Sequence, residues 1–251
     1  MATIPFDAGA AAYDRAAGRW SRLYIPALLT AARIAAGQRV LDVATGTGEA
    51  AVMAASVVGP SGRVLGVDIS LPMLRAGRAK VAGRPVTFMA MDGQALACRD
   101  QSFDGVICQL GLMFFPDAVR GLAEFRRVLR PHGRVAVCVW STPERVPAFA
   151  IIGQALSRHL PAQREILEVP YSLAHAGRLE AILARAGFRD VRTTRERREL
   201  AFKSFDDYWG PIEAGGGRLG QVYLGLPEET RRAVRADVRE RIAQYKSPDG
   251  L

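Results

Sequence analysis

The sequence predicts a doubly wound α/β fold, in which helices cover both faces of a mostly parallel sheet. Two observations support this prediction. Apolar, strand-like runs alternate with helix-like segments between residues 38 and 140, with short breaks between them. Most of these runs are continuously apolar, which is typical of strands buried on both faces. With 251 residues and 49% hydrophobic content, the chain is long enough to bury one such core.

Five strands and three helices are expected in this central region. The strands are Arg39–Val43, Arg63–Asp68, Val86–Met91, Phe103–Cys108 and Arg134–Trp140. The helices lie near 48–58, 71–82 and 118–130, and turn-forming residues stand at Gly59–Gly62 and Arg130–Gly133.

Helical segments flank the predicted sheet. The N-terminal segment Ala10–Ala35 is rich in alanine and has Trp20, Tyr24 and Leu28 at helical spacing. Later helices are expected at Val146–Leu160, Leu173–Ala186 and Pro227–Tyr245. We also expect a sixth strand at Phe188–Thr194, and Arg198–Phe202 is a short candidate for another.

The net charge of +9 raises the question of a nucleic-acid partner. Only three of the 34 basic residues are lysines, and the arginines are scattered along the chain. The two arginine runs, Arg195–Arg198 and Arg231–Arg241, contain interleaved acidic residues, as on a solvated helix face. We therefore expect no nucleic-acid partner.

The cysteines and the apolar segments indicate the compartment. Cys98, Cys108 and Cys138 are far apart and have no partner at metal-ligand spacing, so we expect reduced thiols and no metal. No apolar run approaches the ~18 residues of a spanning helix. The first residues show no export signal, so the expected location is the cytoplasm. The oligomeric state stays open between monomer and homodimer.

The stretch Leu41–Ala51, "LDVATGTGEAA", follows the first strand and carries the main functional signal. Gly46 and Gly48 allow a ligand to approach the backbone closely at the carboxyl end of the strand. This loop fits both a nicotinamide dinucleotide and S-adenosylmethionine. Asp68 ends the second strand and does not separate the two, because both cofactors present ribose hydroxyls to such a carboxylate.

Three features favour S-adenosylmethionine. Asp42 lies inside the first strand, where a carboxylate attracts an ammonium group and repels a pyrophosphate. Glu49 opens the helix whose N-terminus a pyrophosphate would occupy. Met91-Asp92-Gly93-Gln94 closes the third strand and offers a carboxylate and an amide to an adenine edge, although a plain turn is the alternative.

The chain resembles a class I S-adenosylmethionine-dependent methyltransferase of the UbiE-like, type 11 group. The resemblance covers residues 38–140 and rests on five motifs in order. They are "VLDVATGTGEAA", "GVDISLPML", "FMAMDGQAL", "DQSFDGVICQLGLMFFPD" and "EFRRVLRPHGRVAVCVW". It implies a Rossmann-like sheet of order 3-2-1-4-5-(7)-6 with a helical cap.

We expect the chain to form a single domain made of five segments. Its segments are an N-terminal helical cover (1–36), the cofactor-binding core (37–140), a helical insertion over the active site (141–172), the completion of the core by a helix and strand 6 (173–200), and a C-terminal substrate lid (201–251). The run Gly215–Gly217 is expected to act as a hinge or mobile loop in that lid.

Cofactor contacts follow from the resemblance, position by position. The loop would hold the methionine part, Asp68 the ribose hydroxyls, and the residues after strands two and three the adenine. Two residues that end the fourth strand would line the path from sulfonium to acceptor, and aromatic residues of the N-terminal segment would close over the cofactor. The set is Asp42, Ala44, Thr45, Gly46, Thr47, Gly48, Asp68, Ile69, Met73, Met91, Asp92, Gly93, Gln94, Cys108, Gln109, Tyr13, Trp20 and, less directly, Tyr24.

Two departures from the quinone methyltransferases of this group argue against a quinone acceptor. Those enzymes carry Met-Asn after Tyr-Asp, where this chain has Arg15-Ala16 after Tyr13-Asp14. Their later signature ends in Gly-Gly, where this chain has His132-Gly133. His132 is also expected in a surface turn at the amino end of a strand, away from any catalytic site.

The expected activity is methyl transfer to a small-molecule acceptor, at carbon or oxygen of an aromatic, quinone-like or secondary-metabolite compound, with S-adenosylhomocysteine as product. Such a reaction depends mainly on positioning, and a base is an optional addition. Spacing selects no single base from the candidates His159, His175, Tyr171, Tyr208, Asp206, Asp207 and Glu213. The alternatives are a nucleic-acid methyltransferase, a nicotinamide-dependent oxidoreductase and a binding protein that keeps the cofactor without transferring methyl.

Overall fold

The computed structural model describes residue 7, residues 10–15 and residues 17–246. Its centre is a five-stranded sheet in the order β3-β2-β1-β4-β5, with every neighbouring pair parallel. The strands are β1 (Arg39–Val43), β2 (Arg63–Asp68), β3 (Val86–Ala90), β4 (Phe103–Gln109) and β5 (Leu129–Cys138). The first five positions of the expected strand order are therefore confirmed, and so is the α/β class.

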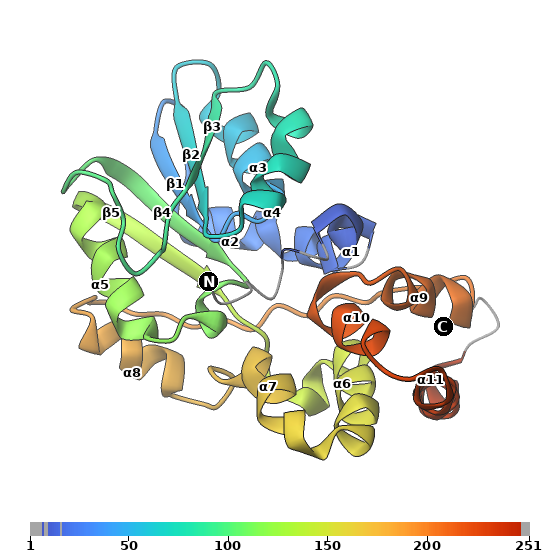
Figure 1. The fold of residues 1–251 in the computed structure, drawn as a ribbon. Coiled ribbons are helices and arrows are strands. Elements are labelled where there is room, and N and C mark those ends of the chain that lie inside the picture. The colour runs from blue at the N-terminus through green and yellow to red at the C-terminus, as the bar shows by residue number, and fades with distance from the viewer. Residues whose placement is uncertain (1–6, 8–9, 16, 247–251) are drawn as a thin grey trace.

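Helices cover both faces of this sheet (Figure 1). On one face α2 (Ile25–Ala31) and α3 (Glu49–Val58) pack on inward-facing strand residues such as Val40. On the other face α5 (Ala118–Val128) and α8 (Arg178–Arg185) pack around Leu41. Val40 and Leu41 are neighbours in β1, and adjacent strand residues point to opposite faces. Helix α4 (Leu71–Gly77) follows β2 and completes the cover near β3.

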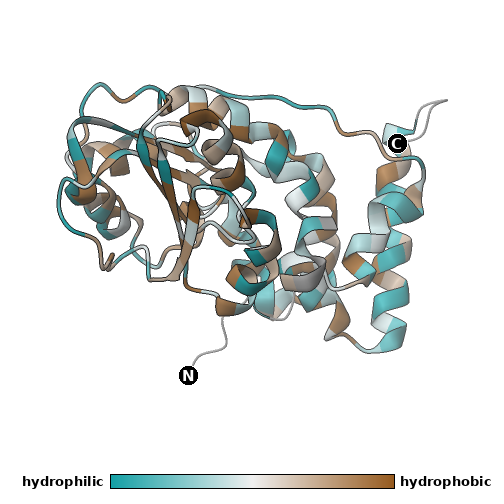
Figure 2. Cartoon of the chain, turned by 90° about the horizontal axis from the view of Figure 1, so that it is seen from above, coloured by the Kyte–Doolittle hydropathy of each residue, from teal (hydrophilic) through white to brown (hydrophobic). Residues whose placement is uncertain are grey.

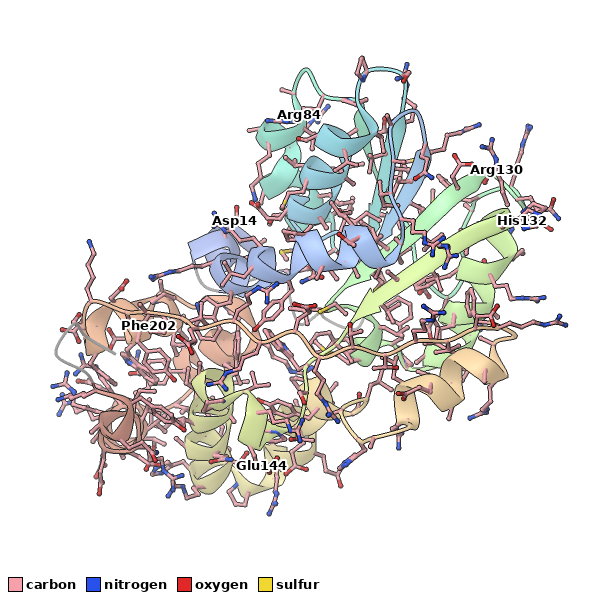
Figure 3. All side chains as sticks on the ribbon, turned by 180° about the vertical axis from the view of Figure 1, so that it is seen from behind. Asp14, Arg84, Arg130, His132, Glu144 and Phe202 are labelled. Atoms are coloured by element: carbon pink, nitrogen blue, oxygen red, sulfur yellow. The ribbon has the colours of Figure 1, made fainter. Side chains whose placement is uncertain are left out.

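A second hydrophobic cluster lies beyond the carboxyl ends of the strands. It joins α1 (Ala17–Ser21), α6 (Pro147–His159), α7 (Arg164–Glu168), α9 (Phe205–Glu213), α10 (Gly217–Leu224) and α11 (Glu228–Ile242). Trp140 stands two residues after β5, and its ring lies 4.9 Å from the Phe149 ring of α6 and 5.8 Å from Tyr24. We call residues 141–172 and 201–246, which contribute α6, α7, α9, α10 and α11 to this cluster, the cap. In Figure 3 the cap residue Phe202 and the exposed His132 lie at opposite ends of the sheet.

The predicted strands after β5 are wrong. Residues 188–202 form no strand, so within the described chain the sheet ends at β5. Phe188 and Val191 still pack on the sheet core, but residues 192–199 are all exposed and mostly charged. Such a segment cannot bury the alternating apolar face that a strand requires. The long extended segment before the C-terminal helices is largely hydrophilic in Figure 2.

Several boundaries also differ from the prediction. The expected turn Arg130–Gly133 lies inside β5, where the register with β4 shifts and His132 has a φ of 67°. The helix expected from Leu173 begins only at Arg178, and Leu173 is a buried loop residue. The glycines Gly215–Gly217 are all buried between α9 and the start of α10, and their expected role as a hinge or mobile loop stays a prediction.

Neither a membrane-spanning helix nor a cluster of metal ligands is present among the described residues. None of their helices is both long and apolar enough to cross a membrane. None of their His, Cys, Asp and Glu side chains form a group of three that could hold a metal ion.

Candidate functional site

Residues 44–48 form the loop that joins β1 to α3. Ala44, Gly46 and Gly48 all have positive φ angles, of 57°, 57° and 86°, so the chain turns sharply at the carboxyl edge of the sheet. A Cβ atom at Gly48 would lie 2.3 Å from the Phe88 ring, which leaves no room for a side chain. The loop is therefore held in a shape that lets a ligand approach its backbone.

Asp42 lies in β1 directly before this loop, and its side chain is fully buried. Its Oδ2 accepts a hydrogen bond of 2.6 Å from the Thr45 hydroxyl, whereas Oδ1 has no hydrogen-bond partner among the described residues. Burial raises the pKa of Asp42 to about 7, and the nearby Asp68 charge adds to this shift. The Thr45 hydroxyl and the backbone amide of Ala51 oppose it. A buried carboxylate oxygen without a partner is costly, so it marks a place where a donor is expected.

Gln109, at the end of β4, presents a second such oxygen. Its Nε2 donates a 2.9 Å hydrogen bond to the carbonyl of Ser21, which fixes the orientation of the side-chain amide. Its Oε1 is buried and lacks a partner within the described chain. The residue is therefore anchored from one side and unsatisfied on the other.

Asp42 and Gln109 line the same narrow cavity of about 30 Å³. Its floor is the β1–α3 loop with the start of α3, and its roof comes from the N-terminal cover. The lining residues are Tyr13, Ser21, Ile25, Asp42, Ala44, Thr45, Gly46, Thr47, Glu49, Ala50 and Gln109. Eight residues of this lining belong to the sheet and its first loop and helix, and three to the cover.

Asp68 ends β2 beside this loop. Its Oδ2 accepts from the Gly46 amide and its Oδ1 from the Ser70 amide, both at 2.8 Å. Burial raises the pKa of Asp68, and these amides oppose the shift. Ser70 also caps α4 by accepting from the Met73 amide, which fixes the buried Met73 beneath the loop, whereas Ile69 is 55% exposed.

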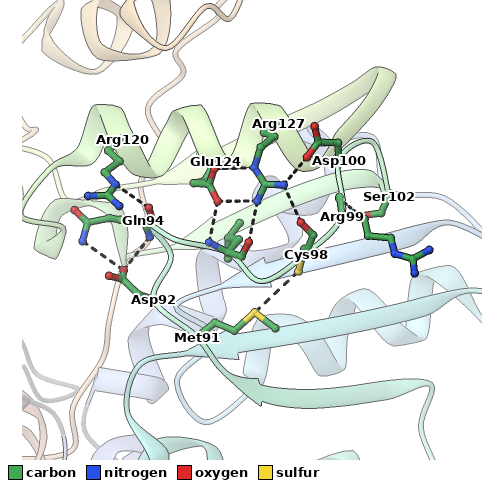
Figure 4. Close-up of polar contacts among 11 residues, drawn as sticks. Met91, Asp92, Gln94, Cys98, Arg99, Asp100, Ser102, Arg120, Glu124 and Arg127 are labelled. Atoms are coloured by element: carbon green, nitrogen blue, oxygen red, sulfur yellow. Dashed lines mark hydrogen bonds and ion pairs between the residues drawn. The ribbon is translucent and has the colours of Figure 1, made fainter.

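The segment after β3 forms an ordered turn (Figure 4). Asp92 is exposed, and its Oδ1 accepts from the backbone amide of Gln94 at 2.8 Å. The Gln94 Oε1 in turn accepts from the Asp117 amide before α5. Gly93 is buried, and Met91 contacts the Cys98 sulfur at 4.0 Å. These residues lie at the carboxyl edge but do not line the cavity around Asp42.

The free acceptor oxygens of this cavity fit the amino-acid end of S-adenosylmethionine. An ammonium group carries three N–H donors, and the free oxygens of Asp42 and Gln109 are acceptors. A pyrophosphate in the same place would lie beside the carboxylates of Asp42 and Glu49, which both line the cavity. Repulsion between the negative pyrophosphate and these carboxylates would disfavour binding.

Comparisons with known proteins agree with this geometry. A family model described as a methyltransferase domain matches residues 40–133. The ubiquinone/menaquinone biosynthesis C-methyltransferase UbiE of Geobacter sulfurreducens is 35% identical over 193 residues, which is 69% of this chain and 72% of that protein. The chain belongs to the UbiE-like family of S-adenosylmethionine-dependent methyltransferases. Its cofactor is accordingly S-adenosylmethionine and not a nicotinamide dinucleotide.

Two further matches cover most of this methyltransferase. The nocamycin O-methyltransferase of Saccharothrix syringae is 32% identical over 244 residues, which is 91% of this chain and 86% of that protein. The crystal structure of the YcgJ protein from Bacillus subtilis matches with a TM-score of 0.55 and 21% identity, over 84% of this chain and 87% of that one. The second likeness shows the fold alone.

Of three further residues predicted to bind the cofactor of the methyltransferase, one lines the cavity and two pack in the hydrophobic clusters. Tyr13 lines the cavity, and burial together with the charges of Asp68 and Asp14 raises its pKa to about 12. Trp20 does not line it, and instead packs against the cap, with its ring 3.9 Å from Phe149. Cys108 also lies elsewhere, fully buried in the core cluster on the α5 face of the sheet.

The seven candidate bases do not converge on the cavity. Tyr208 donates to the Ala148 carbonyl at 2.7 Å, and burial raises the pKa of Tyr171 to about 12. The acidic candidates are paired with arginines of the N-terminal cover and α11, and the two histidines are exposed. The carboxylates are Asp206, Asp207 and Glu213, and the histidines are His159 and His175.

Sequence reasoning missed Ser21 and Lys80 as parts of the site. Ser21 orients Gln109 through its carbonyl, 88 positions earlier in the chain. Lys80 reaches the β1–α3 loop from the 3₁₀ turn that follows α4 and donates a hydrogen bond of 3.1 Å to the Thr47 hydroxyl. The one weak signal is composition, because Lys80 is one of only three lysines in the sequence.

Proposed function

We propose that this methyltransferase methylates an oxygen of a small, flat organic acceptor, such as an enol or a phenol. The observation behind the proposal is a continuous wall of aromatic rings beyond the carboxyl ends of β4 and β5. Tyr24 contacts Trp140, Trp140 contacts Phe149, and Phe149 contacts Trp20. Trp20 directly precedes Ser21, which holds Gln109 at the cavity. Aromatic side chains of this kind favour planar apolar ligands.

In this proposal the cavity and the adjoining edge hold the cofactor. Bound S-adenosylmethionine supplies a methyl group on a sulfonium, already activated for displacement. Asp42 and Gln109 would accept from its ammonium group, and the backbone of residues 44–48 would hold its methionine part. Asp68 would take the ribose hydroxyls. Ile69 and Met73 would hold the adenine, together with Met91, Asp92, Gly93 and Gln94, and Tyr13 would close over the cofactor.

The cap would then hold the acceptor against that methyl group. The proposed roles are cofactor cover for residues 1–36 and acceptor binding for 141–172 and 201–251, while 37–140 and 173–200 form the core. Positioning two reactants within attack distance and excluding water supplies most of the rate enhancement in such a displacement.

An acceptor of low pKa suits this site because the candidate bases are engaged elsewhere or exposed. Tyr208 is bonded to a backbone carbonyl, and Glu213 is paired with Arg235 at 3.0 Å. An enol or acidic phenol ionises in water without help, so such an acceptor arrives as its own nucleophile. The match to an O-methyltransferase extends over 91% of this chain, including the cap, which supports the choice of oxygen.

The test is S-adenosylhomocysteine release with a panel of acceptors whose hydroxyl pKa values span about 5 to 10. We expect the pH at which the rate is half-maximal to follow the pKa of each acceptor. Product spectra should show a new O-methyl group. A half-maximal pH that is the same for every acceptor would instead indicate an enzyme base, and a new C-methyl group would refute oxygen as the target.

A further inference from the structure

Lys80 connects three separate parts of the site. It belongs to the 3₁₀ turn Arg78–Val81, next to the loop and the N-terminal cover. Its Nζ lies 2.6 Å from the Asp14 carboxylate, 2.8 Å from that of Glu49 and 3.1 Å from the Thr47 hydroxyl. The ammonium group donates hydrogen bonds to Glu49 and Thr47 and forms an ion pair with Asp14.

The partners of Lys80 also bind one another. The Thr47 hydroxyl donates a 2.5 Å hydrogen bond to Asp14 while it accepts from Lys80. Thr47 is in the β1–α3 loop, Glu49 opens α3, and Asp14 belongs to the 3₁₀ helix Ala10–Arg15 of the cover. The side chains are only 25–35% exposed, so solvent screens these ion pairs less than at an open surface.

This network holds the roof of the cavity in place. Asp14 is the neighbour of Tyr13, which lines the cavity together with Ser21 and Ile25 of the same cover. The cavity beneath is about 30 Å³, whereas pockets that bind small-molecule ligands typically measure about 300–1,000 Å³. A nucleoside-sized ligand can pass this roof only when the cover moves away.

We propose that Lys80 is a positioning residue that holds the N-terminal cover closed over the cofactor and sets how fast the cofactor product leaves. This inference rests on the proposed assignment of the cavity to the cofactor. Lys80 acts through Asp14 and Thr47, and it touches neither the acceptor nor the methyl group. Its removal leaves the carboxylates of Asp14 and Glu49 facing each other without a cation, which favours opening.

The test is the dissociation rate of S-adenosylhomocysteine from the full-length protein, followed by tryptophan fluorescence in stopped flow. Lys80→Met and Asp14→Asn should each raise this rate about tenfold, as expected for loss of a hydrogen bond to a charged group. The double variant should be no faster than the faster single variant, because the two changes break the same contact. Lys80→Arg should restore part of the slow release, and Lys203→Met is the matched control that removes a lysine from an exposed site.

A second readout needs no cofactor. Opening of the cover should expose the bonds after Arg19 and Arg22, so trypsin should cut there faster in Lys80→Met than in the control. If Lys80→Met does not fold, Asp14→Asn reports on the same contact. If the wild type binds S-adenosylhomocysteine, but both variants release it and are cut by trypsin at the wild-type rates, the proposed role of Lys80 is refuted. The proposed cofactor site is not affected by that result. A wild-type protein that binds no S-adenosylhomocysteine overturns the proposed cofactor site as well.

Discussion

Replacing Asp42 with asparagine should stabilise the cofactor-free protein at high pH and weaken cofactor binding at the same time. The Asp42 side chain is fully buried, and burial raises its pKa to about 7 from the ordinary value of 3.8. Between these two values the folded protein keeps a proton that the unfolded chain has lost. Stability therefore falls as the pH rises through this window and stays low above pH 7.

The size of the effect follows from the shift. A difference of about three pKa units corresponds to about 4 kcal/mol, at about 1.4 kcal/mol per unit. Asparagine has nearly the same shape and keeps an oxygen for the Thr45 hydroxyl, but it carries no charge. We expect the free energy of unfolding of Asp42→Asn to exceed that of the wild type by up to about 4 kcal/mol at pH 8, and by less than half of that amount at pH 5.

The assay is urea unfolding of both proteins between pH 5 and 8.5, with Asp92→Asn as the control for an exposed carboxylate at the same edge. Calorimetric titration with S-adenosylhomocysteine completes it. The wild-type affinity should fall below pH 7 as Asp42 takes up a proton, and the variant should bind more weakly at pH 8 with little dependence on pH. Parallel stability curves for wild type and Asp42→Asn would refute the raised pKa. Equal affinities at pH 8 would refute the contact with the ammonium group.

Three further substitutions test the rest of the site. Gln109→Leu removes both the free oxygen and the bond to Ser21, so the KM for S-adenosylmethionine should rise about tenfold in initial-rate assays. An unchanged KM would contradict this role. Gly48→Ala forces a Cβ into the Phe88 ring at a positive φ and should cost about 2–4 kcal/mol in urea unfolding. A loss below about 0.5 kcal/mol would show that the loop adapts. Tyr208→Phe removes one hydrogen bond to a backbone carbonyl, so it should cost about 1 kcal/mol of stability and leave kcat within about twofold. A large fall in kcat at full cofactor binding would reinstate the tyrosine as a base.

The sheet could be predicted from the sequence because its signals are local. Each strand from β1 to β4 is a short apolar run that ends in a turn or an acid, and its predicted bounds agree with the structure within one residue. The segment Phe188–Thr194 has local strand propensity as well, yet no strand forms there. A strand also needs a partner edge and a face to bury, and neither requirement is visible in seven residues.

The contacts that complete the site could not be predicted in this way. Asp42 could be recognised in the sequence because its carboxylate interrupts a strand that is otherwise apolar. The pairs Gln109–Ser21 and Lys80–Asp14 join residues 88 and 66 positions apart, and each partner is an ordinary polar residue in its own segment. Spacing carries no information on such pairs, since they form only when the cover folds onto the sheet.

The charges around the cavity suggest how substrate and product are distinguished. Four carboxylates, Asp14, Asp42, Glu49 and Asp68, lie at or beside the cavity, and Lys80 is the cation bonded among them. S-adenosylmethionine carries one more positive charge than S-adenosylhomocysteine, so a negative surrounding favours the substrate and assists product release.

Because the ion pairs of Lys80 are partly exposed, salt should screen part of this preference for S-adenosylmethionine. We expect the ratio of the two affinities to fall between 20 mM and 500 mM NaCl in calorimetric titrations, and to fall less in Glu49→Gln, which removes one of the four charges. A ratio that does not change with salt would show that shape around the sulfur, and not the field of these carboxylates, separates the two ligands.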